Sequence, residues 1–395
     1  MAEADVSKAV GLILEGHPAF FKFIAANETG DTGGHQCGFY IPKDFQTIAF
    51  GSPCEKGSNR ELDVEIVWND DLKTPSRLVY YGKGTRNESR ITRFGMGFEY
   101  LKTEYTGALI VFIKVDAAVY STYVMNSEEE IDEFLGALGL GPTDANRLIT
   151  LGGCESAPTE DAEFKKYIES LTVDFPSSEE MSSVARQIEG RVYDHAEYVR
   201  EQPDKKLLSW TDVEYRLFRT LEANRLGSQI SQGFASVDDF LKKANQVLNR
   251  RKSRAGKSFE HHLAAIFTGN EIDYDEQVVT EGNKRPDFIF PSASAYHDAE
   301  FPDDKLTFLA AKTTCKDRWR QILVEAERFK DQTKYLCTLQ CGMSERQIDD
   351  MAAEGVVLVV PKSYIKCYPE SRQADILTVS SFVGMLKEKQ GWTCS

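Results

Sequence analysis

The fold of the second half of the chain is decided by Pro286-Asp287-Phe288-Ile289-Phe290 and by the later run Leu306-Thr307-Phe308-Leu309-Ala310-Ala311-Lys312-Thr313. Both stretches are rich in apolar and aromatic residues, which predicts two short strands. The polar stretch between them contains prolines and serines and predicts a connection. If the two strands are neighbours in a sheet, Asp287 and Lys312 lie side by side.

A third candidate side chain follows Lys312. From Arg318 onward apolar residues recur at helical spacing, and they are Trp319, Ile322, Leu323, Ala326 and Phe329. This spacing predicts a helix with Glu325 at the margin of its buried stripe. Hydrolysis of a phosphodiester needs a hard divalent cation, and Mg²⁺ prefers a few carboxylates plus waters. We therefore predict Asp287 and Glu325 as Mg²⁺ ligands. Lys312 is predicted to hold the phosphate or to lower the pKa of the attacking water.

The pattern departs at one position from many nuclease cores, which have a second carboxylate two residues before the lysine. Ala310 occupies this position. We interpret Glu325 as its replacement, because a helix packed beside the strand can bring a carboxylate to the same point. The alternative is that Pro286-Asp287 begins an ordinary turn and that Lys312 is a solvated lysine, which is the commoner meaning of each piece alone. The combination with nearby basic segments favours a nuclease centre.

Two basic segments flank the predicted centre. Lys316-Asp317-Arg318 is predicted to read adjacent G·C pairs, because Lys and Arg donate to guanine and an acid accepts from cytosine. The alternative is a helix amino-terminal turn with solvated charges. The stretch 249–260 places five cations before one acid in a chain of formal charge −15, so Arg251 and Arg254 are predicted to contact DNA. Glu260 is predicted as a further catalytic residue facing the metal, with a surface position as the alternative.

These segments resemble the EcoRII family of restriction endonucleases. The resemblance rests on Thr280-Glu281-Gly282-Asn283-Lys284-Arg285-Pro286-Asp287-Phe288, on Lys312-Thr313-Thr314-Cys315-Lys316-Asp317-Arg318-Trp319-Arg320, on Thr85-Arg86-Asn87-Glu88-Ser89-Arg90-Ile91-Thr92-Arg93, and on 26–36, 249–260 and 291–298. It extends nearly end to end. The family implies a homodimeric, Mg²⁺-dependent type II endonuclease of the PD-(D/E)xK kind. Such an enzyme cuts double-stranded DNA at a short near-palindromic site that begins with CC and is similar to CCWGG.

The resemblance also assigns roles to residues and partners. It implies that Asp287, Lys312 and Glu325 perform cleavage with Tyr296 in support, although a packed aromatic whose hydroxyl finds a partner is the alternative for Tyr296. It implies that Lys316, Asp317 and Arg318 read the C·G pairs. A cognate DNA cytosine methyltransferase is the implied partner that protects host sites.

Family members have an amino-terminal effector domain, a β-barrel-like fold of the B3 type that binds a second site copy and otherwise blocks the catalytic cleft. The chain agrees with a strand-rich first half. Leu62, Val64 and Ile66 alternate with acids, 109–115 is a continuous apolar run, and 118–125 is rich in aromatic and β-branched residues. Removal of residues 1–172 is therefore predicted to raise cleavage of DNA with one site.

The stretch 83–93 is predicted to be a loop that enters a DNA groove, because it has four cations against one acid. By resemblance, the residues that read the effector site are His35, Tyr40, Arg86, Glu88 and Arg90. Gly84 and Ser89 stand where the family pattern has lysines, which predicts a changed affinity or specificity for the effector DNA.

The length of 395 residues suits two domains. The stretch 154–180 is acidic and contains two prolines, so it is predicted to contain the hinge. We predict an effector domain over 1–172 that ends in this hinge and a catalytic, dimerising domain over 173–395. In the second domain, Ser344-Glu345-Arg346-Gln347 predicts a helix start between strands at 335–339 and 356–360. This unit favours an α/β domain with a mixed central sheet and the metal site at its edge.

Other classes of protein are disfavoured. The eight cysteines show no paired metal spacing, so scattered thiols in a reducing compartment are predicted, and no zinc. No signal peptide or membrane-spanning stretch is recognised, which predicts a cytoplasmic prokaryotic protein, nucleoid-associated when bound to DNA. Two alternatives stay open: a DNA-binding regulator that lost cleavage, and a DNA-repair nicking endonuclease. Retention of Asp287, Lys312 and Glu325 disfavours the first, and a single nick as final product would favour the second.

Overall fold

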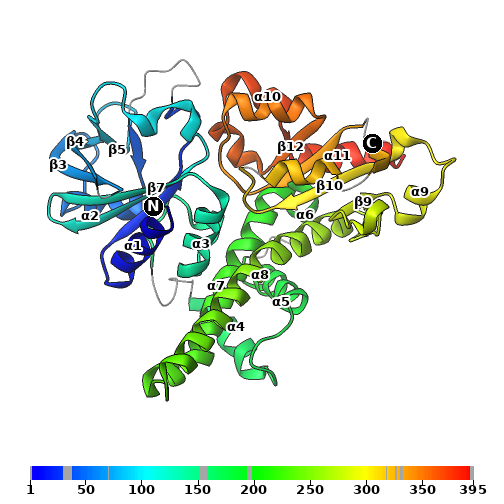
Figure 1. The fold of residues 1–395 in the computed structure, drawn as a ribbon, viewed down its shortest axis with the longest axis horizontal. Coiled ribbons are helices and arrows are strands. Elements are labelled where there is room, and N and C mark those ends of the chain that lie inside the picture. The colour runs from blue at the N-terminus through cyan, green and yellow to red at the C-terminus, as the bar shows by residue number, and fades with distance from the viewer. Residues whose placement is uncertain are drawn as a thin grey trace.

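The computed structural model describes residues 2–29, 38–69, 71–150, 158–193, 198–316, 318–324, 327–329 and 332–391. Over these residues the chain forms two sheets, one in each half, with a layer of long helices beside the second (Figure 1). The predicted α/β fold class is confirmed. No helix in these ranges is both long enough and apolar enough to cross a membrane.

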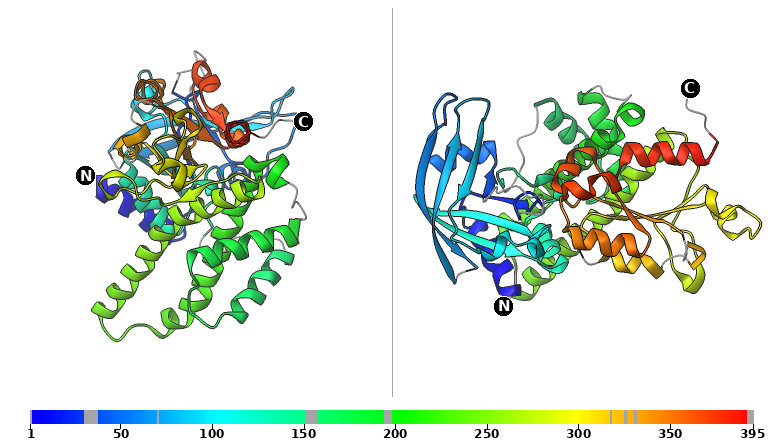
Figure 2. Two further views of the ribbon diagram at one scale, coloured as in Figure 1. Left: turned by 90° about the vertical axis from the view of Figure 1, so that its right-hand side faces the viewer. Right: turned by 90° about the horizontal axis from the view of Figure 1, so that it is seen from above.

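The first sheet is strongly curled (Figure 2). Its strands are β1 (Ala19–Phe23), β2 (Phe39–Ile41), β3 (Arg60–Trp68), β4 (Leu72–Tyr81), β5 (Glu88–Thr92), β6 (Leu109–Asp116) and β7 (Val119–Met125). They lie in the order β1-β6-β7-β3-β4-β5-β2, and all neighbours are antiparallel except β3 and β7. The curled sheet confirms the strand-rich first half and agrees with the barrel-like fold that the family resemblance implied.

Two apolar layers explain the hydrophobic patterns in this half. Ile110 and Phe112 of β6 face an aromatic cluster inside the curl, to which α2 (Lys43–Phe50) contributes Phe45. Leu109 and Val111 face the opposite way, toward α1 (Ala2–Leu14) and α3 (Glu128–Leu138). Because β6 is buried on both faces, its sequence is continuously apolar rather than alternating.

The stretch 83–93, predicted as a loop, is only partly a loop. Residues 88–92 form β5, which pairs with β4 and with the edge strand β2. Ser89 and Ile91 face the core while Glu88 and Arg90 are half-buried on the other face. The alternation of β5 is masked in sequence by its charges, which is why the pattern suggested a loop.

Helices occupy the middle of the chain. They are α4 (Pro158–Ser170), α5 (Ser178–Tyr193), α6 (Tyr198–Glu201), α7 (Pro203–Gln232) and α8 (Val237–Gly269). Much of the predicted hinge is therefore helical, because Pro158 sits in the first turn of α4, where proline is tolerated. Phe164 and Ile168 of α4 pack against α5 and α7. The acids of this stretch thus lie largely on a packed helix.

The second sheet is mixed, as predicted. Its strands are β8 (Asp275–Glu276), β9 (Phe288–Phe290), β10 (Thr307–Lys312), β11 (Lys334–Thr338), β12 (Val356–Val360) and β13 (Leu377–Thr378), and they lie in the order β13-β12-β11-β10-β9-β8. Strands β10 to β13 are parallel to one another, whereas β9 pairs antiparallel with both β10 and β8. Helices α7, α8 and α11 (Val379–Lys389) cover one face. The other face is covered by α10 (Glu345–Ala353) and by 3₁₀ turns, and the short α9 (Ala293–His297) follows β9.

Two local predictions in this domain had different outcomes. Ser344 and Gln347 form the predicted capping box at the start of α10. The helix predicted after Arg318 is instead a pair of 3₁₀ helices, Arg318–Val324 and Glu327–Phe329. Trp319, Ile322 and Phe329 are buried as the spacing indicated. Local periodicity found the buried side chains but did not distinguish the two helix types.

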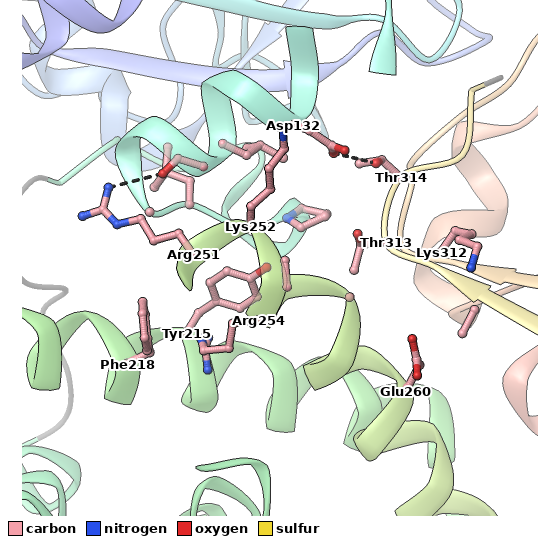
Figure 3. Close-up of a pocket in the computed structure, with 18 of the residues that line it drawn as sticks. Asp132, Tyr215, Phe218, Arg251, Lys252, Arg254, Glu260, Lys312, Thr313 and Thr314 are labelled. Carbon is pink, nitrogen blue, oxygen red and sulfur yellow. Dashed lines mark hydrogen bonds between the residues drawn. The ribbon is translucent and has the colours of Figure 1, made fainter. Parts of the chain in front are cut away.

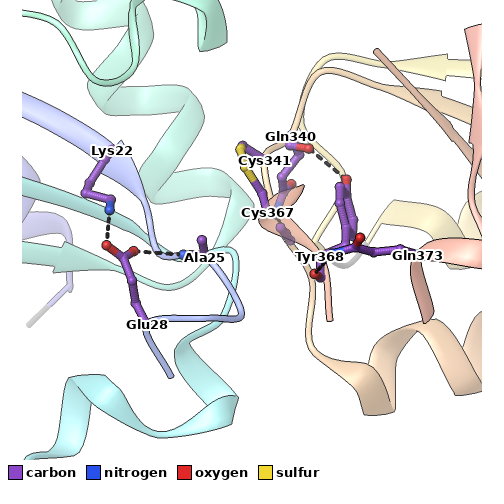
Figure 4. Close-up of a disulfide and its surroundings, with 9 residues drawn as sticks. Lys22, Ala25, Glu28, Gln340, Cys341, Cys367, Tyr368 and Gln373 are labelled. Atoms are coloured by element: carbon purple, nitrogen blue, oxygen red, sulfur yellow. Dashed lines mark hydrogen bonds and ion pairs between the residues drawn. A yellow bond between two sulfur atoms is a disulfide. The ribbon is translucent and has the colours of Figure 1, made fainter. Parts of the chain in front are cut away.

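The cysteine prediction needs correction, because Cys341 and Cys367 form a disulfide (Figure 4). They are 26 residues apart, and no spacing rule indicated their pairing. The bridge lies where the two halves meet: the Ala26 N–H donates to the Cys367 carbonyl at 3.0 Å, and Gln340 Nε2 donates to the Gly107 carbonyl at 3.3 Å. Within the described ranges the thiols of Cys54, Cys315 and Cys337 are free.

Candidate active site

Asp287 and Lys312 lie together as predicted. Strand β9 pairs with β10 through Phe288 and Leu309, so Asp287, which precedes β9, lies opposite the end of β10. Asp287 Oδ2 accepts hydrogen bonds from the Ala311 N–H at 2.8 Å and from Lys312 Nζ at 3.1 Å. The carboxylate is therefore held by two donors and is 7% exposed.

Glu260 joins this pair from α8. Gln277 Nε2 donates to Glu260 Oε2 at 3.3 Å and to Asp287 Oδ1 at 3.1 Å, which links the two carboxylates. Burial, and then the nearby charge of Asp287, raise the pKa of Glu260 to about 7. Figure 3 shows Glu260 pointing from its helix toward the strand end that bears Lys312. Glu260 is thus partly buried next to Asp287, and its predicted role toward a metal stays a prediction.

Three other residues considered for this centre have different surroundings. Tyr296 is buried, stacks on Phe329 with ring centroids 5.8 Å apart, and donates its hydroxyl to Glu281 Oε2 at 2.6 Å. This is the packed-aromatic alternative left open by the sequence. Ala310 is fully buried in the sheet core. Glu325 lies outside the described residues.

A cavity of about 280 Å³ opens beside Glu260 and Lys312 (Figure 3). Residues of α3, α8 and the end of β10 line it, and the charged ones are Asp132, Arg251, Lys252, Arg254, Glu260, Lys312 and Arg318. Cations outnumber acids in this lining. Four of the five cations pair with carboxylates: Arg251 with Glu222, Arg254 with Glu214, Lys312 with Asp287, and Arg318 with Glu128 and Asp132.

The predicted base-reading segment is held by α3 of the first half. The N–H groups of Lys316 and Arg318 donate to the Glu128 carboxylate at 2.9 and 2.7 Å. The Arg318 guanidinium also contacts Glu128, at 3.2 Å, and forms an ion pair with Asp132, while Lys316 Nζ donates to Asn126. Asp317 lies outside the described residues. The side chains of Lys316 and Arg318, which the sequence predicted to face DNA, are thus in contact with Asn126, Glu128 and Asp132 of the first half.

The two arginines of α8 also have protein partners. Arg251 pairs with Glu222 and donates to the Ala137 carbonyl at the end of α3, at 2.6 Å. Arg254 is 7% exposed and donates to Glu214 at 2.5 Å. Burial opposes ionisation of Glu214, yet Arg254 and His262 lower its pKa to about 2. A DNA contact by Arg254 would require breaking this buried pair, so its position differs from the exposed one expected from sequence.

The predicted effector residues that the structure describes gather at one end of the curled sheet. Tyr40 of β2 pairs with Arg90 of β5, and Arg90 Nε donates to Glu88 Oε1 at 3.3 Å. Arg86 lies in the loop that leads into β5. His35 lies outside the described residues. Three of the five residues thus share two neighbouring strands.

The two departures from the family pattern have structural correlates. Ser89 faces inward, where its hydroxyl accepts a hydrogen bond from Gln46 Nε2 at 2.7 Å. Gly84 has a φ of 64° and open space around its Cβ position. Its carbonyl accepts from Lys56 Nζ at 2.9 Å, so an ammonium group lies next to this loop even without a lysine at 84.

The sequence did not indicate three residues that contact the candidate site: Gln277, Glu128 and Asp132. The capping box of Ser127 and Glu130 identifies the start of α3 from sequence, but it does not indicate what the helix contacts. Gln277 lies in a short irregular stretch with no motif. No signal in the sequence links these residues to the catalytic centre.

Comparison with known proteins supports the class of fold and site. The family described as restriction endonuclease EcoRII, N-terminal, matches residues 15–143, and EcoRII C terminal matches 218–383. The type II restriction enzyme EcoRII of Escherichia coli is 39% identical over an alignment of 399 positions, which covers 94% of each chain. The type II restriction enzyme SsoII of Shigella sonnei is 30% identical over 117 residues, 28% of this chain and 37% of its own.

Two solved structures are also similar. Metal-depleted Ecl18kI in complex with uncleaved DNA is 20% identical, covers 59% of this chain and 86% of its own, and has a TM-score of 0.46. The PspGI–substrate DNA complex is 16% identical, covers 54% of this chain and 93% of its own, and has a TM-score of 0.45. The domain matches and the relatives define a restriction endonuclease of type II. Within that class, the chain belongs to the EcoRII family.

Proposed function

We propose that this protein hydrolyses phosphodiester bonds of double-stranded DNA with Mg²⁺ at a short near-palindromic site beginning with CC. The observation that supports this most directly is that Asp287 lies against Lys312 and is linked to Glu260 through Gln277, beside a cavity that Lys312 and Glu260 line. The test is digestion of a plasmid of known sequence with and without Mg²⁺, followed by sequencing of the ends. Fragments with defined 5′-phosphate ends support the proposal, and intact plasmid contradicts it.

The residues present suit a magnesium ion. Mg²⁺ in phosphoryl-transfer sites is usually held by one or two carboxylates, with waters and substrate phosphate completing its shell. Asp287 and Glu260 are two such carboxylates. Among the described residues, no group of three or more His, Cys, Asp or Glu side chains is arranged to hold a metal. Glu325 stays a proposed further ligand.

The side chains have separate tasks in this proposal. Bound Mg²⁺ would neutralise charge on the phosphate oxygens and lower the pKa of an attacking water. Asp287 and Glu260 supply negative oxygens at a fixed spacing. Lys312, held against Asp287, donates to the phosphate as its charge grows, because ammonium–oxyanion hydrogen bonds are stronger than neutral ones. Lys316 and Arg318 contact base edges once α3 has moved away.

We expect the pH dependence of cleavage to depend on Mg²⁺ through Glu260. The pKa of Glu260 is raised to about 7, so its carboxylate form, which binds the cation, is depleted below that pH. At limiting Mg²⁺ the rate should rise as pH increases through about 7, and excess Mg²⁺ should shift this midpoint to lower pH. Initial rates from pH 6 to 8 at two Mg²⁺ concentrations test this. A midpoint of the rate–pH curve that does not change with Mg²⁺ concentration would count against Glu260 as a Mg²⁺ ligand. The same midpoint in Glu260→Gln would also count against it.

We further propose that two copies act together, since a two-fold dimer matches a near-palindrome. The far ends of α7 and α8 project away from both sheets (Figure 1) and expose apolar side chains. Ile230, Val237, Phe240, Leu241 and Leu248 are 42% to 73% exposed there. Clustered exposed apolar groups of this size mark interaction surfaces. The proposed occupant of this surface is a second copy of the chain.

Leu241→Glu is expected to shift the protein from dimer to monomer, because it places a charge in the proposed apolar contact. Light scattering at micromolar concentration measures the mass. Lys242→Glu, on the same exposed turn of α8, is the matched control and should stay dimeric. A Leu241→Glu protein that keeps the dimer mass would refute this surface. The same variant should accumulate nicked plasmid if both copies are needed to cut both strands.

The effector half is proposed to bind a second copy of the site through Tyr40, Arg86, Glu88, Arg90 and His35. We place the boundary between the halves after Asp144 and before α4, rather than at residue 172, because α4 packs on α5 and α7.

Protection of host sites by a DNA cytosine methyltransferase and action in the cytoplasm follow from the same proposal. An inactive DNA-binding regulator is disfavoured, since the carboxylate pair and Lys312 have no use in such a protein.

A further inference from the structure

Gln277 has a backbone conformation that is unusual for a residue with a side chain. It follows β8 directly, has a φ of 51°, and donates its N–H to the Asp287 carbonyl at 3.2 Å. Strand β8 pairs with β9 through Glu276 and Phe288, so Gln277 is placed opposite Asp287. Non-glycine residues with positive φ are uncommon, and strained backbone of this kind occurs often at functional sites.

The side chain of Gln277 joins two parts of the fold. Its single amide nitrogen donates to Glu260 of α8, at 3.3 Å, and to Asp287 at the start of β9, at 3.1 Å. An amide NH₂ group has two hydrogens, so one can serve each carboxylate. The oxygen of Asp287 that Gln277 contacts is Oδ1, whereas Ala311 and Lys312 contact Oδ2. Gln277 therefore orients the carboxylate oxygen that faces Glu260.

The neutrality of the amide matters for a cation site. A lysine or arginine at this position would also bridge two carboxylates, but its positive charge would oppose a divalent cation. An acid would add repulsion between carboxylates. A glutamine holds both carboxylates by hydrogen bonds and leaves their negative charge available.

We propose that Gln277 is a positioning residue that holds the Glu260 and Asp287 carboxylates at the spacing needed to bind one divalent cation together. This inference rests on the proposed Mg²⁺-dependent function. Hydrogen-bonding partners of metal ligands typically contribute about 10- to 100-fold to metal affinity. Loss of the Gln277 amide should therefore weaken cation binding without removing a ligand.

The test is binding of Mn²⁺ to the full-length protein without DNA, measured by the electron paramagnetic resonance signal of the free ion. Gln277→Met keeps the length of the side chain and removes its donors, and it is expected to weaken Mn²⁺ binding about tenfold. Gln277→Asn keeps the amide and suits a positive φ, but it is shorter, so it should also bind weakly. Equal affinity of Gln277→Met and wild type would overturn the proposal.

Two control variants show whether a loss of Mn²⁺ affinity is specific to Gln277. Gln390 also anchors the stretch that leads into β8, through hydrogen bonds with the Asp273 N–H and carbonyl at 3.0 and 2.8 Å. Gln390→Met should leave Mn²⁺ affinity unchanged, and an equal loss in both variants would reduce Gln277 to a structural anchor. Asp287→Asn should abolish binding. If it does not, the proposed metal site itself fails; if it does while Gln277→Met binds normally, only the role of Gln277 fails.

Gln277→Gly gives a readout that a purely structural role would not produce. Glycine relieves the cost of the positive φ, so thermal stability should stay the same or increase. Mn²⁺ affinity should nevertheless fall as it does for Gln277→Met. A glycine variant that loses stability and affinity together would contradict a positioning role.

Discussion

Lys312→Ala is expected to lower the rate of DNA cleavage by about 10²- to 10³-fold, the usual effect of removing one donor that stabilises charge in the transition state. The Lys312 ammonium lies 3.1 Å from Asp287 Oδ2 at the end of β10, next to the cavity. Its loss removes the cation that opposes growing charge on the phosphate. Single-turnover cleavage of a plasmid with saturating protein measures the effect without a contribution from product release.

DNA affinity distinguishes this role from simple electrostatic attraction. Lys312→Ala should bind a short duplex containing the site nearly as well as wild type, because other cations line the same cavity. Lys305→Ala removes an exposed lysine just before β10 and is the matched control, for which both rate and affinity should stay unchanged. Cleavage by Lys312→Ala within a few-fold of wild type would refute the proposed role.

The second large effect concerns α3. Combined replacement Glu128→Gln and Asp132→Ala is expected to raise cleavage of DNA with a single site at least about tenfold. The Glu128 carboxylate accepts the Lys316 and Arg318 N–H groups while 2% exposed, and Asp132 pairs with the Arg318 guanidinium. Breaking one partner of a buried charged contact costs about 2–5 kcal/mol, and 1.4 kcal/mol corresponds to tenfold in an equilibrium. The population with an open cleft should increase accordingly.

Glu129→Gln with Glu133→Gln is the matched control for this experiment. These exposed residues of α3 give a similar loss of charge, and the ion pairs of Arg318 are with Glu128 and Asp132 instead. The control should leave single-site cleavage unchanged, and equal activation in both pairs would point to general charge rather than to the contact. Deletion of residues 1–172 should activate in the same direction, but it also removes α4 and uncovers the apolar faces of α5 and α7 that Phe164 and Ile168 cover. The side-chain replacements are therefore the cleaner measurement.

The sequence predicted those parts of the site that depend on local order. Asp287 and Lys312 are separated by one connection between neighbouring strands, so strand patterns were enough to place them together. Glu260 comes from a helix, and periodicity shows which face of α8 is buried but not which strand end that face meets. The position of Glu260 beside Asp287 therefore depends on the packing of α8 on β10, which the sequence did not indicate.

Contacts between the two halves could not be predicted from the sequence for a different reason. Glu128 and Arg318 are 190 residues apart, and an acidic helix can pair with many basic segments of similar charge. Arg254 illustrates the reverse error: a cluster of cations suggested a surface for DNA, whereas Glu214 on α7 buries one of them. Charge in a sequence indicates that a partner exists, but only three-dimensional packing selects which one.

The disulfide between Cys341 and Cys367 joins the segment after β11 to the 3₁₀ helix Lys362–Cys367 of the same half, so it does not link the two halves. If the two halves separate, as proposed, the hydrogen bonds of Ala26 and Gly107 must break along with the Arg318 ion pairs, and water can replace those hydrogen bonds. The disulfide thus fixes one side of the contact between the halves without linking the halves covalently. If the halves separate and associate repeatedly, the surface around the disulfide should keep its conformation between these events.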